Sequence, residues 1–394
     1  MPKMSMNARR EYLIQLKPRY LKLSKKDKGL FLTEASETTG LNKNYLSGLL
    51  QAMVDLKWRQ IRPRKPRKKI YDNEVVYHLK KIWDVLDCPC GERMKGSLPG
   101  TLDALIRHKE IIVSDEMKNK LLKASPSTID RVLKRFKAIK RRSLHGSTKP
   151  GSFLKKHIPI ELSRWDEKKL GWSEIDLVSH NGGNPNGFFA NTLTDTDLAS
   201  GWTELAAFLG KSELRVVESL SAIDNRRPFK RKGIDSDNGS EFINWNLLRF
   251  CEQEDIKFTR GRSGKKNDNA HVEQKNWTHV RKLVGYRRYD TKRQVDLLND
   301  LYQNEWRSYE NFFQATVKLK EKKRIGGHLH KKYEPAKTPY QRIIESDEVD
   351  ETTKTRLKEQ YLSLNPAELK QQIKKKLEVI IQTTKSIKHC KPNS

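Results

Sequence analysis

The apolar periodicity of the chain changes from helical to alternating near residue 171, and this change constrains the fold more than any other feature. The stretch GWSEIDLVSH, residues 171–180, predicts a β-strand because Trp172, Ile175, Leu177 and Val178 supply its apolar positions. Further strands are predicted at residues 187–197, 201–209, 229–237 and 256–261, and helices at residues 211–226, 240–255 and 267–286. The predicted order of elements is therefore β-β-β-α-β-α-β-α.

The charge of the chain is concentrated outside this central stretch. The formal net charge is +31, whereas residues 171–290 hold 18 Lys or Arg against 17 Asp or Glu, a net charge of +1. Two basic flanks around a nearly neutral centre favour a catalytic body carried by nucleic-acid-binding modules. A highly soluble basic protein or one of the ribosomal type is the alternative.

The N-terminal flank has helical periodicity. Residues 25–51 predict two helices around a turn at Gly40, with Leu41, Tyr45, Leu46, Leu49 and Leu50 facing inward. Such a helix-turn-helix would present to a DNA groove the side chains of Asn42, Lys43, Asn44 and Ser47. A plain helical bundle with a solvated basic face is the alternative.

A second helix-turn-helix pattern covers residues 113–137. Ser125 is the expected N-cap and Pro126 the first helical residue. The apolar side of this helix is expected to hold Ile129, Val132, Leu133 and Phe136, and the exposed side to hold Arg131, Lys134 and Arg135. We predict that these three basic residues contact DNA.

These patterns predict four regions and a fold class. The fold class is α/β, with a ribonuclease-H-like core built on a five-stranded mixed sheet. The regions are a helical DNA-binding region at 1–142, a linker at 143–170, the core at 171–290 and a basic, partly helical C-terminal region at 291–394. Residues 318–343 mix Lys and Arg with Tyr and turn residues, which predicts a small segment that binds the DNA backbone.

Three acidic residues occupy unusual positions in the predicted core. Asp176 lies inside an apolar strand, Asp237 ends the fourth strand and Glu273 lies early in the last helix. Carboxylates that converge at the edge of a sheet repel one another unless cations neutralise them, and oxygen ligands select Mg²⁺ or Mn²⁺. The nearby Asp235 is a weaker candidate, and Asp195 and Asp197 are expected to be turn residues.

The motifs around these acids resemble those of the retroviral-integrase superfamily. SDNGSEF is similar to its second-aspartate motif, NDNAHVEQKNW to its glutamate motif and WSEIDLVSH to its first motif. Thirty-five residues separate Asp237 from Glu273, which is the interval found in that superfamily. The wider pattern, over most of residues 25–345, is similar to bacterial insertion-sequence transposases with an integrase-type core.

The resemblance implies an activity and a set of site residues. Asp176, Asp237 and Glu273 would be the catalytic residues and would bind two Mg²⁺ ions, for which Mn²⁺ would substitute. The residues expected beside the site, as supports or phosphate contacts, are Asn238, Gly239, Lys275, Asn276 and Arg281. Trp277 and Val280 depart from the family pattern, since retroviral members have DNA-contacting lysines there.

The resulting hypothesis is a DNA transposase that binds the terminal repeats of its element, cleaves the 3′ ends and joins them to target DNA. Its partners would be double-stranded DNA and further copies of itself, at least as a dimer on DNA. The alternatives are a DNA-binding regulator with an inactive integrase-like core and a ribonuclease-H-like nuclease. The four scattered cysteines and the lack of a long apolar run predict a cytoplasmic protein without membrane contact, and the resemblance points to a bacterium.

Overall fold

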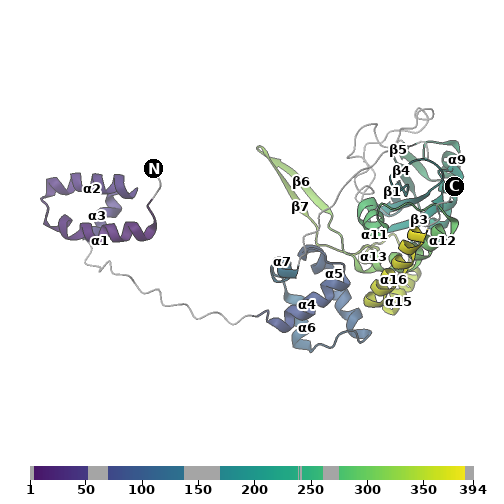
Figure 1. The fold of residues 1–394 in the computed structure, drawn as a ribbon, viewed down its shortest axis with the longest axis horizontal. Coiled ribbons are helices and arrows are strands. Elements are labelled where there is room, and N and C mark those ends of the chain that lie inside the picture. Colours follow the sequence, from purple (N-terminus) through teal and green to yellow (C-terminus); the bar gives the residue numbers. More distant parts are fainter. Residues whose placement is uncertain are drawn as a thin grey trace, which may run out of the picture. The chain divides into compact units, whose positions relative to one another are not determined.

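The computed structural model describes residues 4–51, 70–136, 169–260 apart from 238, 240 and 241, and 275–386. The chain divides into two compact units, Met1–Lys69 and Ile70–Ser394 (Figure 1). Within the described residues, no helix combines the length and the apolar character that crossing a lipid bilayer requires.

The first unit contains three helices: α1 (Met6–Lys22), α2 (Lys25–Thr39) and α3 (Lys43–Gln51). Gly40 ends α2 with φ of 68°, a left-handed conformation that glycine adopts without strain, so the predicted turn is confirmed. Leu46 and Leu50 are buried as predicted. The prediction for Tyr45 is wrong, because its side chain is 58% exposed on the outer side of α3.

The second unit begins with a bundle of four helices: α4 (Asn73–Val85), α5 (Gly91–Arg107), α6 (Asp115–Lys123) and α7 (Pro126–Leu133). The predicted start of α7 is confirmed, since Ser125 accepts a hydrogen bond from the Thr128 amide and Pro126 is the first helical residue. Ile129 and Leu133 are buried, while the three basic residues predicted to face outward are exposed: Arg131, Lys134 and Arg135.

This bundle packs with the rest of the second unit, so the compact units do not divide at the predicted boundary of residue 142. Tyr309 donates its hydroxyl hydrogen bond to the Val85 carbonyl at 2.6 Å, and Ser97 accepts one from the Ala315 amide at 2.9 Å. A Cβ atom on Gly96 would lie 2.1 Å from the carbonyl oxygen of Ala336. Glycine therefore allows α5 to approach the C-terminal part of the chain directly.

The centre of the second unit is the predicted five-stranded mixed sheet, in the order β3-β2-β1-β4-β5. Its strands are β1 (Trp172–Ser179), β2 (Ala190–Asp197), β3 (Thr203–Leu209), β4 (Gly233–Ser236) and β5 (Lys257–Arg260). The first three strands are antiparallel neighbours, whereas β4 pairs in parallel with both β1 and β5. This arrangement confirms the predicted sequence of strands and the mixed α/β class.

The two faces of the sheet pack against different helices. One face packs against α8 (Glu213–Asp224) and α9 (Trp245–Gln253) around Ile175, Leu193 and Ile234. The elements packed on the other face, or against one another beside it, are the π-helix η3 (Asn276–Arg281), α11 (Lys282–Val284), α12 (Lys292–Leu301), the π-helix η4 (Tyr302–Trp306) and α13 (Arg307–Phe313).

The predicted end of the core at residue 290 falls inside this packed unit. Helix α12 lies against β3, where Asn299 exchanges hydrogen bonds with the backbone of Ala207 at 2.7 and 2.8 Å. The C-terminal elements are the strands β6 (Leu319–Ile325) and β7 (His328–Tyr333) and the helices α14 (Pro339–Ile344), α15 (Glu351–Ser363) and α16 (Pro366–Ser386). Apolar residues of α15 and α16 belong to the same core as α12 and α13, so burial extends the unit past residue 290.

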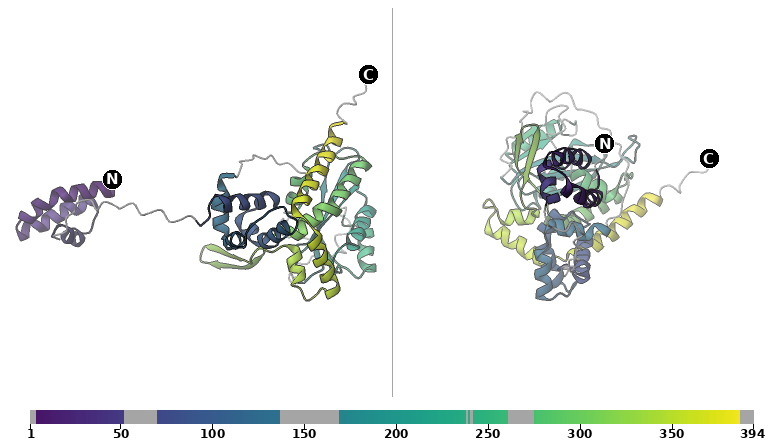
Figure 2. Two further views of the ribbon diagram at one scale, coloured as in Figure 1. Left: turned by 90° about the horizontal axis from the view of Figure 1, so that it is seen from below. Right: turned by 90° about the vertical axis from the view of Figure 1, so that its left-hand side faces the viewer.

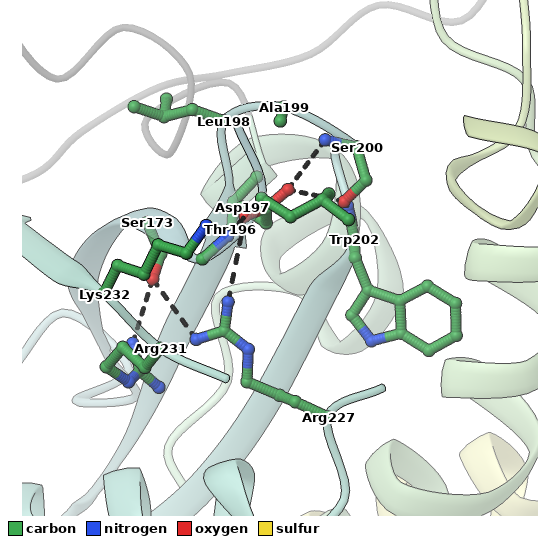
Figure 3. A network of polar contacts seen from close by, with 12 residues as sticks. Ser173, Thr196, Asp197, Leu198, Ala199, Ser200, Trp202, Arg227, Arg231 and Lys232 are labelled. Carbon is green, nitrogen blue, oxygen red and sulfur yellow. Dashed lines mark hydrogen bonds and ion pairs between the residues drawn. The ribbon is translucent and has the colours of Figure 1, made fainter. Parts of the chain in front are cut away.

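Asp195 and Asp197 are buried strand residues rather than turn residues, which corrects the prediction. Both lie in β2, where Asp195 is 2.5 Å from Arg231 and 3.6 Å from Arg227. Figure 3 shows Arg227 and Arg231 meeting at Ser173, with Asp197 accepting hydrogen bonds from Ser200. Burial opposes ionisation of Asp195, but the two guanidinium groups outweigh it and hold the pKa of Asp195 below its usual range.

Candidate functional site

The register of β1 and β4 brings Asp176 and Asp237 to the same level of the sheet. Ile175 pairs with Ser236, and each aspartate is the next residue in its strand direction. Ile175 and Ser236 face the core formed with α8 and α9, so alternation directs Asp176 to the opposite face, where η3 packs. The two carboxylates therefore come from adjacent parallel strands at one end of their pairing.

Hydrogen bonds hold each carboxylate. Asn276 of η3 donates from Nδ2 to Asp176 Oδ2 at 2.5 Å, and the Leu177 amide donates to Asp176 Oδ1 at 2.7 Å. The Gly239 amide donates to Asp237 Oδ1 at 2.8 Å, which closes a turn directly after β4. Both carboxyl groups are half-buried.

The donor chemistry at this position suits a hard divalent cation. Two carboxylates on adjacent strands offer oxygen ligands, which Mg²⁺ and Mn²⁺ prefer. Asn276 Oδ1 is buried beside them without a hydrogen-bond partner among the described residues, so the amide keeps one acceptor available. Two predicted site residues, Asn238 and Glu273, lie outside the described residues. Accordingly, the described part of the chain contains no group of three potential metal ligands.

Lys275 precedes the π-helix η3, and Arg281 is its last residue. Burial lowers the pKa of Lys275 to about 8, the charges of Arg93 and Arg342 add to this lowering, and Glu310 opposes it. Arg281 donates to the Ser179 carbonyl at 2.9 Å, and its guanidinium carbon lies 4.6 Å from the centre of the Tyr286 ring. Arg281 thus has structural contacts at a position where a phosphate contact was expected, whereas Lys275 Nζ is buried without a hydrogen-bond partner among the described residues.

Asp235 has a partner of its own. Thr259 of β5 donates its hydroxyl hydrogen bond to Asp235 Oδ1 at 2.6 Å. Asp235 lies two residues before Asp237 on the same strand, so it provides a chemically matched comparison for the site.

Sequence reasoning missed Arg288, which holds the loop that follows β1. Its guanidinium donates to the carbonyls of Asn184 and Asn186 at 2.9 Å and of Phe188 at 3.0 Å, and it forms an ion pair with Asp290 at 2.9 Å. The signal in the sequence was the polar run NGGNPNG, which follows the first strand directly and leaves many carbonyls for a donor. This loop starts four residues after Asp176 along the chain.

The residues predicted to contact DNA in the first unit lie at the start of α3. The side chains of Asn42, Lys43 and Asn44 are exposed, and Asn42 Oδ1 accepts a hydrogen bond from the Asn44 amide at 2.8 Å. Ser47 is half-buried, because its hydroxyl accepts from Gln51 at 3.0 Å and lies 3.3 Å from the Tyr20 hydroxyl.

The fold and site define an α/β protein whose mixed sheet carries paired carboxylates on adjacent parallel strands. The chain belongs to the family of "Uncharacterized protein y4rM" from Sinorhizobium fredii (strain NBRC 101917 / NGR234). It is 33% identical to that protein over 343 residues, which cover 86% of this chain and 96% of the relative. No family model matches the sequence.

Two solved structures align with parts of the chain. A chain of the simian T-cell lymphotropic virus intasome, solved in complex with the PP2A regulatory subunit B56 gamma, aligns with a TM-score of 0.34 and 14% identity, covering 60% of this chain and 73% of that chain. The catalytic core domain of BIV integrase aligns with a TM-score of 0.28 and 16% identity, covering 45% of this chain and 95% of that one. The α/β fold class follows from the order and directions of the five strands.

Proposed function

We propose that this chain is a DNA transposase that cleaves the 3′ ends of its element and joins them to target DNA. One observation carries the proposal: Asp176 and Asp237 lie level with each other on adjacent parallel strands, and Asn276, three residues after Glu273, hydrogen-bonds to Asp176. Together with the motif spacing in the sequence, this supports Asp176, Asp237 and Glu273 as the acidic triad.

The residues of the site have distinct roles in this proposal. Two like charges on adjacent strands disfavour each other's ionised form unless a cation lies between them. A bound pair of Mg²⁺ ions would supply charge stabilisation to the attacking and leaving oxygens of an in-line displacement. Asn276 fixes the orientation of the Asp176 carboxylate, and the Gly239 amide fixes that of Asp237. Preorganised ligands of this kind are costly to lose, because misplacement weakens metal binding directly.

DNA recognition is assigned to the helical parts of the chain. The start of α3 presents Asn42, Lys43 and Asn44, and α7 with the turn after it presents Arg131, Lys134 and Arg135. Exposed basic and amide side chains at helix ends suit contacts with phosphates and base edges. We propose that they bind the terminal repeats, and that two copies of the chain, one at each end of the element, act in one complex on DNA.

The test is an assay of nicking and joining with labelled duplexes made from the DNA on either side of the gene. With Mg²⁺ the wild-type protein is expected to yield nicked and joined products, which EDTA, Asp237→Asn and Glu273→Gln abolish while DNA binding persists. Asp235→Asn is the matched control and should retain joining, since its amide can still accept from Thr259. Tight binding without cleavage under any divalent metal would instead favour a DNA-binding regulator.

A further inference from the structure

The strands β6 and β7 form a two-stranded antiparallel ribbon that extends away from the sheet and the four-helix bundle (Figures 1 and 2). Residues 319–324 of β6 and every residue of β7 are exposed. Isolated two-stranded hairpins are marginally stable in water, because neither face is buried. The ribbon therefore gains little stability from burial of its own side chains. Its two exposed faces are free to contact a partner.

The ribbon is strongly basic. Residues 319–333 contain six Lys or Arg, two His and one Glu. Lys322 pairs directly with Lys331 across the strands, and like charges in such positions destabilise a hairpin. The glutamate lies on the other face, where Glu321 forms an ion pair with Lys323 at 2.6 Å.

The register divides the side chains between two faces. Lys322, Arg324 and Lys331 share one face, which carries no acidic residue of the ribbon. Lys323, His330 and Lys332 share the other face with Glu321. Positive charge therefore lies on both faces of the ribbon, and the first face has the larger excess.

The base of the ribbon is fixed to the body of the unit. Thr316 and Lys337 exchange backbone hydrogen bonds of 2.9 and 3.2 Å below the strands. Arg342 donates to the Thr316 carbonyl at 2.8 Å and to the Ser200 carbonyl at 3.2 Å, and Lys318 donates to the carbonyls of Leu198 and Ala199. The turn between β2 and β3 thus holds the base while the Gly326–Gly327 end projects.

We propose that the ribbon of β6 and β7 lies in a groove of double-stranded DNA as a third DNA-binding element of this chain. The major groove admits a two-stranded β-ribbon, and its two phosphate walls meet cations on both faces of such a ribbon. A flat anionic surface such as a lipid bilayer would contact only one face, which leaves the other unexplained. The choice of DNA as the partner rests on the proposed function. The proposal itself concerns DNA binding, which is measured without strand transfer.

The test compares two triple variants of equal charge change in the full chain. The ribbon variant is Lys322→Gln, Arg324→Gln and Lys331→Gln, and the control is Arg356→Gln, Lys374→Gln and Lys375→Gln on exposed positions of α15 and α16. Affinity for a labelled duplex is measured by fluorescence anisotropy at several salt concentrations, with circular dichroism as a check on folding. Methylation at guanine N7 reports occupancy of the major groove.

The ribbon variant is expected to bind DNA at least about tenfold more weakly, because it loses contacts with phosphates. Each lost contact should also reduce the slope of log affinity against log salt concentration by about one unit. Protection of guanine N7 should shrink with it, while the control changes affinity less than about twofold. Equal affinity, slope and protection in the two variants would overturn the proposal. Loss of binding to phosphatidylserine vesicles with DNA affinity intact would overturn it in favour of a membrane surface.

These outcomes are separable from the test of the proposed function. If the wild type joins DNA, Asp237→Asn abolishes joining and the ribbon variant binds DNA normally, only the ribbon proposal is contradicted. If the wild type never cleaves DNA but the ribbon variant loses DNA affinity and salt dependence, only the proposed function is contradicted.

Discussion

Asn276 donates a hydrogen bond from its side-chain amide to Asp176 at 2.5 Å, linking the π-helix η3 to the central strand β1 across one hundred residues of sequence. The contact orients the Asp176 carboxylate toward the face of the sheet that also carries Asp237. It also fixes the start of η3, which begins within the glutamate motif.

Removing this hydrogen bond should impair the Mg²⁺-dependent strand transfer more than it lowers the stability of the fold. Asn276→Ala is expected to lower the rate of strand transfer about 10–100-fold and to raise the Mg²⁺ concentration needed for half-maximal activity, as loss of a group that orients a ligand does. The measurement is a Mg²⁺ titration of joining. Thr278→Ser on the same helix is the control, and an unchanged Mg²⁺ requirement in Asn276→Ala would refute the orienting role.

Arg288 should determine the order of the loop after β1. Arg288→Ala removes the donor shared by the carbonyls of Asn184, Asn186 and Phe188, so the amides of residues 181–188 should exchange with deuterium faster. The neighbouring Arg287→Ala, an exposed position, is the matched control. Equal exchange in both variants would show that Arg288 does not order the loop.

The buried ion network should be essential for stability. Arg231→Met leaves Asp195 buried with its principal cation lost, which is expected to lower the free energy of unfolding by about 3–5 kcal/mol. Arg215→Met breaks an exposed ion pair with Glu218 and should cost less than about 1 kcal/mol. Urea denaturation followed by tryptophan fluorescence measures both. Similar midpoints for the two variants would contradict the account of the network.

Stability should fall in mildly acidic solution partly through His180. Burial lowers the pKa of His180 to about 3, with Arg281 adding to the effect. The folded state thus excludes a proton that the unfolded state binds below about pH 6.5, so the stability from this group is complete above about 6.5 and is lost as the pH falls toward about 3. The expected slope is about 1.4 kcal/mol per pH unit.

His180→Gln tests this dependence, since glutamine does not titrate. Urea denaturation at pH 7, 6 and 5 should give a shallower loss of stability in His180→Gln than in the wild type. His328→Gln, at an exposed position of β7, should keep the wild-type slope. A steep slope that persists in His180→Gln would assign the acid sensitivity to another group.

Local sequence patterns predicted much of the sheet and individual helix termini, such as the end of α2 at Gly40. Alternating apolar residues predicted the five strands, and Ser125 with Pro126 predicted the start of α7, because these signals act within a few residues. The positions of Asp176 and Asp237 on neighbouring strands also followed from the order of elements, once the fourth strand is placed beside the first.

Contacts between distant residues could not be predicted in the same way. The pairing of Asp195 with Arg231 and the close approach of Gly96 to Ala336 depend on tertiary packing, which the local pattern LTDTD or a single glycine does not encode. Tyr45 has the apolar spacing of its helix but lies on the outside, because the side of α3 that packs on the small core beside α1 holds Leu46, Leu49 and Leu50. The ribbon was predicted as a basic segment that binds the DNA backbone but not as two strands, since these strands lack an alternating apolar face.

Binding of Mn²⁺ to the complex of protein and DNA tests the central claim most directly, since the claim is that Asp176 and Asp237 jointly bind a divalent cation. Electron paramagnetic resonance of free Mn²⁺ gives the affinity for the wild type, Asp237→Asn and the matched Asp235→Asn. The account predicts that Asp237→Asn weakens Mn²⁺ binding at least about tenfold while Asp235→Asn binds like the wild type. Equal Mn²⁺ affinity in all three proteins would contradict it.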